Sequence, residues 1–578
     1  MDASAHNSME NGACAMPDNF DDHLIALEGI KLMLNNGFKE AEALFNKFKT
    51  TSPQMSAGAS FFSFLNGMMT FEDERLVQAS NDLRATQKLC NIPDETLNAI
   101  KSKFSKKAAQ RPQLPLSKVL QNKIIIADCH LYLALISFIQ QDITGYIKGG
   151  WTLRKAWKIY EKTYEQISLL KRVSQAEPQG STRETKSSND LKLKEQAKSI
   201  SKEILERLYG SVSFGFGLFN LCVSLIPQKL LKVVNLIGFH GDREVGLEAL
   251  QSASESEDMK APLAMLALLW YHTVVRPFFA VDGDKADSGI PVAEAIMAKH
   301  EPVYPKSSFV LFFKGRIQRC KCDISTALIS FQLAYDAGVD QREFQLMCAY
   351  EIGWCSLMEL DWAKALEYFI MLKNESKWSV CYYTYLTALM SGMTDDKVEC
   401  MKLFIEVPKT MKIKSNQLEI YIVRKALLFI KTPATYEFLL IYILELLYLW
   451  RAFPNCTKES LNKILDECAK ITSPSLNGLK NLIVGGLHNS LGNTDAAIEC
   501  FRTAMKVSDR DYDDGHIAPY ACYELASILI EKPGMKQKGL EILRHCKDGY
   551  EGYDFENRLQ MRIHATEHRL KQQKSTGN

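Results

Sequence analysis

Three residues recur along this chain with one fixed spacing, and the repeat constrains the fold more than any other feature of the sequence. A glycine is followed twelve residues later by an alanine, and four residues after that by a phenylalanine or leucine. Five copies are present: Gly29, Ala41 and Phe45; Gly67, Ala79 and Leu83; Gly315, Ala327 and Phe331; Gly353, Ala365 and Phe369; Gly485, Ala497 and Phe501. The first two copies are 38 residues apart, as are the next two. A regular step of this size predicts stacked copies of one structural unit.

The spacing predicts a pair of antiparallel helices. Twelve residues take the chain from the middle of one helix, through a tight turn, to the first turn of the next. Alanine and phenylalanine four residues apart share one face of that second helix. Glycine lets the two backbones approach closely, and we expect the phenylalanine to fill the space toward the neighbouring pair. Turn-forming residues stand between the helices at 35–37, 321–323 and 491–493, where Asp323 and Asn493 are placed to cap the second helix.

This glycine, alanine and phenylalanine pattern resembles the tetratricopeptide repeat, whose fold is an antiparallel helix pair stacked into a superhelix. A small residue three positions after the phenylalanine, such as Ala334 or Ala504, strengthens the resemblance. The usual period is about 34 residues, so the step of 38 adds roughly one helical turn. The aromatic residues that the family favours beside the glycine are replaced here, for example by Leu311 and Gln318.

The rest of the chain also favours helix. No segment shows the short alternating pattern of β-branched residues that is typical of strands. Prolines number 18 in 578 residues, which suits long helices. We therefore predict an all-α fold: an α-solenoid of tetratricopeptide-like helical hairpins with an irregular central helical region.

Composition shifts predict six segments. The run Gln175–Asp190 is almost free of apolar residues and divides two helical blocks. The predicted segments are a disordered lead (1–19), an N-terminal helical repeat block (20–170), a disordered linker (171–197), glycine-rich apolar central helices (198–300), C-terminal tetratricopeptide repeats (301–570) and a tail (571–578).

Apolar segments raise the question of a membrane span. Ala261–Val281 contains His272 and Arg276, and Phe438–Trp450 is short and contains Glu445, so we predict buried helices rather than spans. Peripheral membrane contact stays open. The segment Gly210–Pro227 carries three glycines and allows two interpretations, a tightly packed central helix or a wall facing a cavity or lipid.

The sequence offers little catalytic chemistry. The formal charge of +2 argues against a nucleic-acid binder, and fifteen scattered cysteines indicate reduced thiols in a cytoplasmic protein. His564, Glu567 and His568 match the H-x-x-E-H pattern of zinc peptidases, but no third ligand follows in the remaining residues. We predict no catalytic, cofactor-binding or metal-binding residues, no cofactor and no enzyme activity.

Several longer blocks resemble the tetratricopeptide repeat protein 39 family. They are Ile124–Phe138, Tyr146–Tyr160, Gly210–Pro227, Met259–Ala280, Tyr350–Ser356 and Gly552–Leu559. The resemblance covers nearly the full length and implies a helical-repeat protein without established catalytic activity. It also implies links to lipid or lipid-droplet handling, to protein turnover through ubiquitination, or to cilium-related processes.

Two functions from different classes follow. The first is a cytoplasmic scaffold or adaptor that binds a protein partner in a groove lined by the first helix of each pair. Polar residues predicted to line that groove are Lys314, Gln318, Glu351 and Asn489. The second is a lipid- or lipid-droplet-associated protein that holds an apolar ligand in the region Gly210–Ala280 or docks on a membrane.

Overall fold

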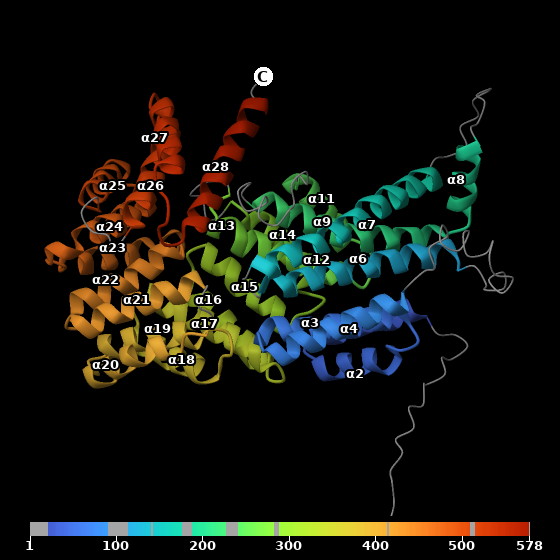
Figure 1. Cartoon of the computed structure of the whole chain (residues 1–578), viewed down its shortest axis with the longest axis horizontal. Coiled ribbons are helices and arrows are strands. Elements are labelled where there is room, and N and C mark those ends of the chain that lie inside the picture. Colours follow the sequence, from blue (N-terminus) through green and yellow to red (C-terminus); the bar gives the residue numbers. More distant parts are fainter. Residues whose placement is uncertain are drawn as a thin grey trace, which may run out of the picture. The chain divides into compact units, whose positions relative to one another are not determined.

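The structure is a computed structural model that describes residues 21–90, 114–139, 143–175, 188–226, 241–281, 288–412, 416–508 and 515–576. Helices and the turns between them make up these residues, and no strand occurs among them, so the predicted all-α class is confirmed (Figure 1). The chain divides into two compact units. Unit 1 holds the described residues within Met1–Leu221 and Glu244–Ala264, and unit 2 holds those from Met265 onward together with two short pieces before Glu244.

Unit 1 is built from antiparallel helix pairs followed by a more irregular set. Figure 1 shows α3 beside α4 and α6 beside α7, each pair joined by a short connection. The helices are α1 (Asp22–Leu34), α2 (Phe38–Phe48), α3 (Pro53–Thr70), α4 (Asp73–Leu89), α6 (Leu116–Ile139), α7 (Ile143–Gln175), α8 (Ser188–Lys198), α9 (Lys202–Leu225) and α11 (Arg243–Ser254).

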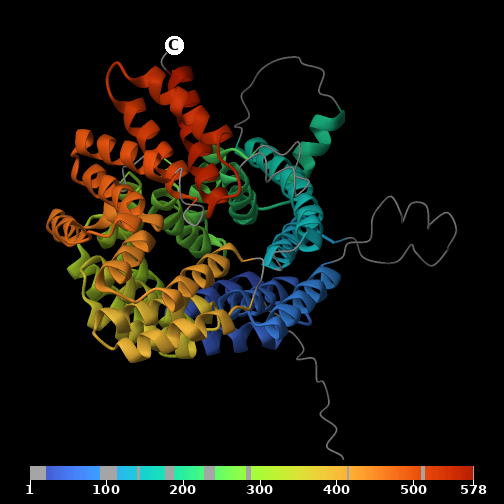
Figure 2. The same cartoon turned by 60° about the vertical axis from the view of Figure 1, so that its left-hand side comes forward.

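Unit 2 begins inside α12 and continues as a series of helix pairs, which Figure 2 shows from another side. Its early helices are α12 (Ala261–Trp270), the π-helix η2 (Tyr271–Val275), α13 (Arg276–Phe278), α14 (Ile290–His300), α15 (Ser308–Cys320), α16 (Ile324–Ala337), α17 (Arg342–Met358), α18 (Trp362–Glu375), α19 (Val380–Met393) and α20 (Lys397–Glu406). The later ones are α21 (Gln417–Lys431), α22 (Tyr436–Leu449), α23 (Lys458–Ala469), α24 (Asn477–Leu491), α25 (Thr494–Ser508), α26 (Ile517–Glu531), α27 (Lys536–Asp548) and α28 (Glu556–Thr576), with 3₁₀ turns at Val407–Lys409, Phe453–Asn455 and Pro474–Leu476.

The ring of the repeated phenylalanine packs directly against the repeated glycine of the paired helix. A Cβ atom added at Gly315 would lie 2.7 Å from Cε1 of Phe331, which is closer than side chains pack. The same contact occurs in three further copies, at Gly29, Gly353 and Gly485. The predicted hairpins are therefore confirmed, although the ring packs on its own hairpin as well as toward the next. The copy at Gly67 differs, because that glycine faces Leu76 instead of Leu83.

Two turns inside the hairpins share the same local structure, a residue in the left-handed conformation followed by an aspartate that caps the second helix. Cys322 and Leu360 both adopt the left-handed conformation, with φ of 60° and 58°. The next residues, Asp323 and Asp361, accept hydrogen bonds of 3.3 and 3.1 Å from the backbone N–H three positions later. Asp323 thus caps α16 as predicted, whereas the side chain of Asn493 lies beside a histidine of the preceding helix.

The glycines of the central segment serve close packing within unit 1. A Cβ at Gly217 would lie 2.8 Å from the carbonyl oxygen of Gly246, and one at Gly246 would lie 2.7 Å from the amide nitrogen of Leu221. Helices α9 and α11 therefore cross at these two glycines. Gly215 lies directly against the ring of Tyr160. The structure thus bears out the first interpretation of this segment, a tightly packed helix.

The helices extend past two predicted boundaries. Helix α7 runs to Gln175 and α8 spans Ser188–Lys198, so both ends of the predicted disordered linker (171–197) are helical. Helix α28 continues to Thr576, inside the predicted tail (571–578). Polar composition was a poor guide here, because Lys, Glu and Gln favour helix even on a solvated surface.

Unit 1 also continues through α8 and α11, so the boundary predicted at residue 198 falls inside it. The predicted lead (1–19) and the middle of the linker (176–187) lie outside the described residues.

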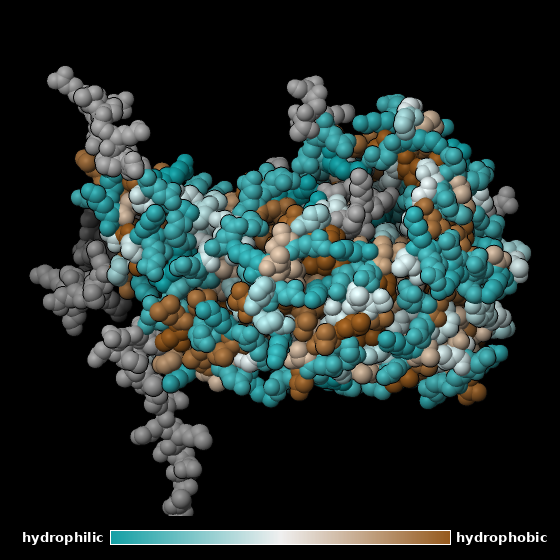
Figure 3. Space-filling model, turned by 180° about the vertical axis from the view of Figure 1, so that it is seen from behind, coloured by the Kyte–Doolittle hydropathy of each residue, from teal (hydrophilic) through white to brown (hydrophobic). Residues whose placement is uncertain are grey.

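One of the apolar segments that the sequence marks is buried as expected, but the helices with the length and hydropathy of a membrane span are others. Helix α22 is buried from Leu439 to Leu449, so the predicted buried helix at Phe438–Trp450 is confirmed. Within the part of the chain that the structure describes, the helices long and apolar enough to span a membrane are instead α6 and α9, and 61% of the apolar stretch of each is buried. Core helices of folded domains share these properties. On the face drawn in Figure 3, hydrophobic residues form patches between hydrophilic ones.

Candidate functional site

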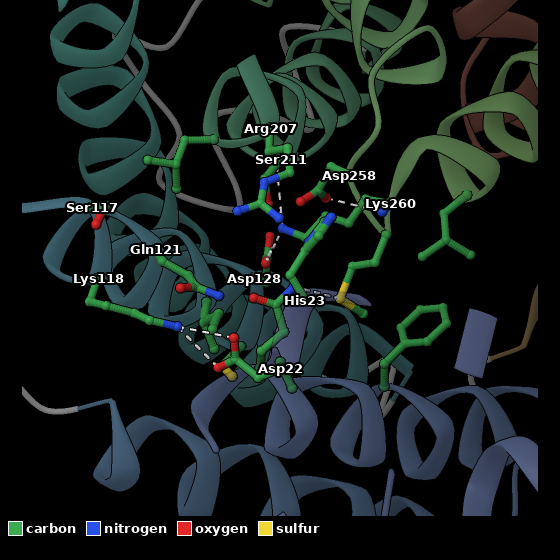
Figure 4. Close-up of a pocket in the computed structure, with 18 of the residues that line it drawn as sticks. Asp22, His23, Ser117, Lys118, Gln121, Asp128, Arg207, Ser211, Asp258 and Lys260 are labelled. Carbon is green, nitrogen blue, oxygen red and sulfur yellow. Dashed lines mark hydrogen bonds and ion pairs between the residues drawn. The ribbon is translucent and has the colours of Figure 1, made fainter. Parts of the chain in front are cut away.

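The first helices of unit 1 line a pocket of about 150 Å³ that mixes charged and apolar side chains, which we call the first-helix pocket. Helices α1, α3 and α6 each open a helical hairpin and each contribute to it. Helix α9 and the turn before α12 complete the wall with Arg207, Ser211, Asp258 and Lys260. Figure 4 shows these side chains converging from several helices.

Asp22 joins the beginnings of the three first helices. Its carboxylate accepts a hydrogen bond of 3.1 Å from the hydroxyl of Ser52, which caps α3. It also accepts bonds of 3.0 and 3.1 Å from Nζ of Lys118 at the start of α6. Asp21 caps α1 by accepting from the backbone N–H of His23. The pocket therefore sits where these helix starts are aligned (Figure 4).

A buried ion pair forms one side of the pocket. Nζ of Lys260 lies 2.5 Å from Oδ2 of Asp128, and the hydroxyl of Tyr160 donates to Oδ1 at 2.6 Å. Burial raises the pKa of Asp128, while the Lys260 ammonium and the Tyr160 hydroxyl oppose that rise. Because both carboxylate oxygens are occupied, this group holds α6, α7 and the turn before α12 together.

Arg207 is the charged group of the pocket that lacks a partner. Its side chain is half-buried, and it forms no hydrogen bond or ion pair with any residue that the structure describes. Burial and the Arg207 guanidinium lower the pKa of His23, so the imidazole is neutral at neutral pH. Lys118 and Lys260 are each paired with an aspartate, which leaves Arg207 as the cation of the lining without an ion pair among the described residues. Two further carboxylates, those of Asp21 and Asp258, belong to the same lining.

The chemistry of the pocket suits binding. Burial raises the pKa of the Cys129 thiol well above its ordinary value, which keeps this sulfur protonated and weakly nucleophilic. The Asp128 carboxylate is occupied on both oxygens and offers no free base. Arg207 and Gln121, by contrast, both line the pocket, and the guanidinium and the amide each carry N–H groups from which a carboxylate can accept hydrogen bonds.

The residues predicted to line a groove in unit 2 lie in different surroundings. Lys314 forms an ion pair of 2.7 Å with Glu301, and Oε1 of Gln318 accepts from the hydroxyl of Ser330 at 2.6 Å. Asn489 is half-buried on α24. None of the described pockets includes these residues.

Glu351 was predicted as a groove residue, and the structure places it in the core instead. Its carboxylate accepts from the guanidinium of Arg316 at 2.8 Å and is also paired with Arg319. Arg316 donates in turn to the carbonyl oxygen of Thr273 at 2.8 Å. This carbonyl lies in the π-helix η2 and also accepts a hydrogen bond of 3.5 Å from the thiol of Cys320, so α15 is fastened to η2 through it.

The H-x-x-E-H segment lies on α28. His564 is half-buried and His568 is exposed, and Glu567 forms ion pairs with Lys547 of the neighbouring helix. Among the described residues, no group of three His, Cys, Asp or Glu side chains is arranged to hold a metal ion.

The first-helix pocket was missed because its parts are distant in the sequence. Asp128 and Lys260 are 132 residues apart, and neither belongs to a recurring motif. The signal that could have been used was Asp128 itself, an acidic residue within the apolar run Ile124–Phe138.

Fold and site together define a class, a helical-repeat protein in which first helices of successive hairpins line a common pocket. The family model described as Iml2/Tetratricopeptide repeat protein 39 matches residues 27–484. The chain belongs to this family.

Solved structures are similar at low identity. Yeast Tom70 matches with 12% identity over 90% of this chain and 98% of that chain, with a TM-score of 0.27. A human IFIT1 dimer with m7Gppp-AAAA matches with 12% identity over 86% of this chain and 96% of that chain, with a TM-score of 0.31. These superpositions are loose, so the family assignment depends on the family match.

Proposed function

We propose that this chain is a non-enzymatic scaffold or adaptor, and that the first-helix pocket holds an acidic group of its protein partner. The observation that carries the proposal is Arg207, a half-buried residue whose side chain forms no hydrogen bond or ion pair with any described residue. Burying an unpaired charge is costly, and a carboxylate that accepts two N–H bonds from arginine removes that cost.

The shape of the site supports an extended partner segment. Three successive first helices line the pocket, and such surfaces in stacked helical repeats bind peptides or helices. An acidic side chain or a terminal carboxylate would enter beside Arg207 and Gln121. The rest of the segment would follow the first helices.

The setting of this role is also part of the proposal. We place the protein in the cytoplasm, where its described cysteines, all free thiols, would stay reduced. Within the family the chain is most similar to the C member. Family resemblance supports partners in cilium-related processes or in protein turnover.

Site-specific crosslinking tests the proposal. A photo-crosslinking amino acid placed at Gln121 in the full chain, expressed in cells, should capture a partner through an acidic peptide. The same amino acid at the exposed Lys162 is the control for random encounters. Arg207→Glu should reduce the Gln121 crosslink by about tenfold, because it replaces a bidentate donor with a like charge.

Arg172→Gln is the matched variant, since Arg172 is an exposed arginine of unit 1 outside the pocket. A Gln121 crosslink that persists in Arg207→Glu, or a partner captured equally from Lys162, would refute this use of the pocket.

The alternative function is lipid association. It is favoured by the length and apolar character of α6 and α9. The glycines of α9 argue against lipid association, because they contact Tyr160 and Gly246 inside unit 1 and are therefore not exposed to a lipid. Flotation of the purified chain with phosphatidylcholine vesicles or lipid droplets decides between the two. Co-flotation, or lipid extracted from the purified protein, would favour the alternative.

A further inference from the structure

A second pocket of unit 1 lies between α4, α6 and α7 and has a volume of about 230 Å³. We call it the basic pocket. Helix α4 contributes Arg84 and Gln87, α6 contributes His130, and α7 contributes Lys148 and Lys155. No aspartate or glutamate is among the described residues that line it. Its charge is therefore set by three cations.

Helical periodicity gathers these groups. Ser80, Arg84 and Gln87 lie at positions i, i+4 and i+7 of α4, and Lys148 and Lys155 lie seven residues apart on α7. Each set therefore shares one face of its helix. The hydroxyl of Ser80 adds a further hydrogen-bond donor to the pocket.

The cations are not neutralised by the described part of the chain. Arg84, Lys148 and Lys155 form no ion pair and no side-chain hydrogen bond with any residue described. All three residues are exposed, so water screens their mutual repulsion, and an anion in the pocket would be attracted by all three at low ionic strength.

Two buried polar atoms give an independent sign of a ligand. Nε2 of Gln87 and Nδ1 of His130 are inaccessible to solvent and have no hydrogen-bond partner in the structure. Buried polar atoms are nearly always hydrogen-bonded in folded proteins. A rotation of the Gln87 side chain would bring its amide to an oxygen atom seated in the basic pocket and leave fewer such atoms unsatisfied.

We propose that the basic pocket binds a phosphate group, carried by a small soluble molecule or by a phospholipid headgroup. A phosphate monoester brings nearly two negative charges and three acceptor oxygens, and arginine and lysine are its usual partners. A carboxylate would bring one charge to three cations. The volume of about 230 Å³ exceeds that of a phosphate group, so the pocket also has room for part of its carrier.

This inference goes beyond the proposed function. The basic pocket shares no lining residue with the first-helix pocket. On α6, His130 lies on a different face from Asp128, because residues two positions apart in a helix point about 200° apart around its axis. An Arg207 variant should therefore bind phosphate as the unmodified protein does, which keeps the two proposals separable.

Calorimetric titration of the full chain at low salt tests the proposal, with inorganic phosphate and glycerol 3-phosphate as probes. The double variant Lys148→Gln/Lys155→Gln should weaken binding of both probes by at least about tenfold. Lys162→Gln removes an exposed lysine of the same helix that does not line the pocket, and it should bind normally.

Thermal unfolding provides a second measurement that does not depend on enzyme activity. Phosphate should raise the melting temperature of the unmodified chain, whereas the double variant should melt at the same temperature with and without phosphate. Absence of binding by the unmodified chain to phosphate, glycerol 3-phosphate and vesicles would overturn the proposal. So would a double variant that binds like the unmodified chain.

Vesicles distinguish the two sources. Phosphatidylcholine vesicles containing phosphatidylinositol 4-phosphate should retain the chain if the phosphate belongs to a headgroup, and plain phosphatidylcholine vesicles should not. Binding to glycerol 3-phosphate alone assigns a soluble ligand. A phosphoserine peptide that binds while glycerol 3-phosphate does not would overturn the small-molecule assignment.

Discussion

Phe331→Ala is expected to lower the free energy of unfolding by about 3–5 kcal/mol, as removal of a fully buried phenylalanine does. The ring is 0% exposed and rests on Gly315 of the paired helix, with a further ring contact to Phe312. Alanine leaves a cavity that these neighbours cannot close. Urea denaturation followed by circular dichroism measures the change.

Leu333→Ala on the same helix is the matched control. Leu333 is 49% exposed, so its replacement should change stability by roughly 0.5 kcal/mol or less. Equal losses in the two variants would contradict the placement of Phe331 at the centre of a hairpin.

Glu351→Gln is expected to cost about 3–5 kcal/mol, because it leaves two arginines buried without their carboxylate. Arg316 and Arg319 are 7% and 6% exposed, and neither can reach water without disrupting the core. The amide can still accept a hydrogen bond but carries no charge. Glu367→Gln, an exposed change on α18, is the control and should be nearly neutral.

The same pair of variants has a predicted pH dependence. Burial alone raises the pKa of Glu351, but the guanidinium groups of Arg316 and Arg319 lower it below its ordinary value. A lowered pKa in the folded state stabilises the protein above the unfolded pKa of about 4.3, and this contribution is lost as pH falls through the folded pKa. The stability gap between the unmodified chain and Glu351→Gln should therefore narrow in acid. A gap that stays constant down to the acid transition would argue against a charged Glu351.

Much of the fold follows from local patterns. Gly315, Ala327 and Phe331 obey a spacing that only a helix pair explains, and Asp323 follows the residue at the left-handed turn. Such features act between residues close in sequence, so the sequence reveals them. The burial of Glu351 could not be read this way, because it depends on Arg316 and Arg319, which lie 35 and 32 residues away in the sequence.

The pockets were hidden for the same reason. The faces of α4 and α7 that carry Arg84 and Lys155 are visible as helical spacings, but nothing in either segment shows that the two faces meet. Arg207 was equally inconspicuous, because an arginine is informative only when its lack of a partner is known. Composition also misjudged α8, whose charged residues favour a solvated helix.

A double-mutant cycle between Gly315 and Phe331 tests the central claim most directly, namely that the repeated phenylalanine ring packs directly against the repeated glycine of its hairpin. In the unmodified chain Gly315→Ala should cost about 1–3 kcal/mol, because the new methyl group meets the ring. In the Phe331→Ala background the methyl enters vacated space, and the better helix propensity of alanine should make the change neutral or stabilising by up to about 1 kcal/mol. A coupling free energy of at least about 1 kcal/mol is therefore predicted, whereas additive effects of the two substitutions would contradict the contact on which the repeat depends.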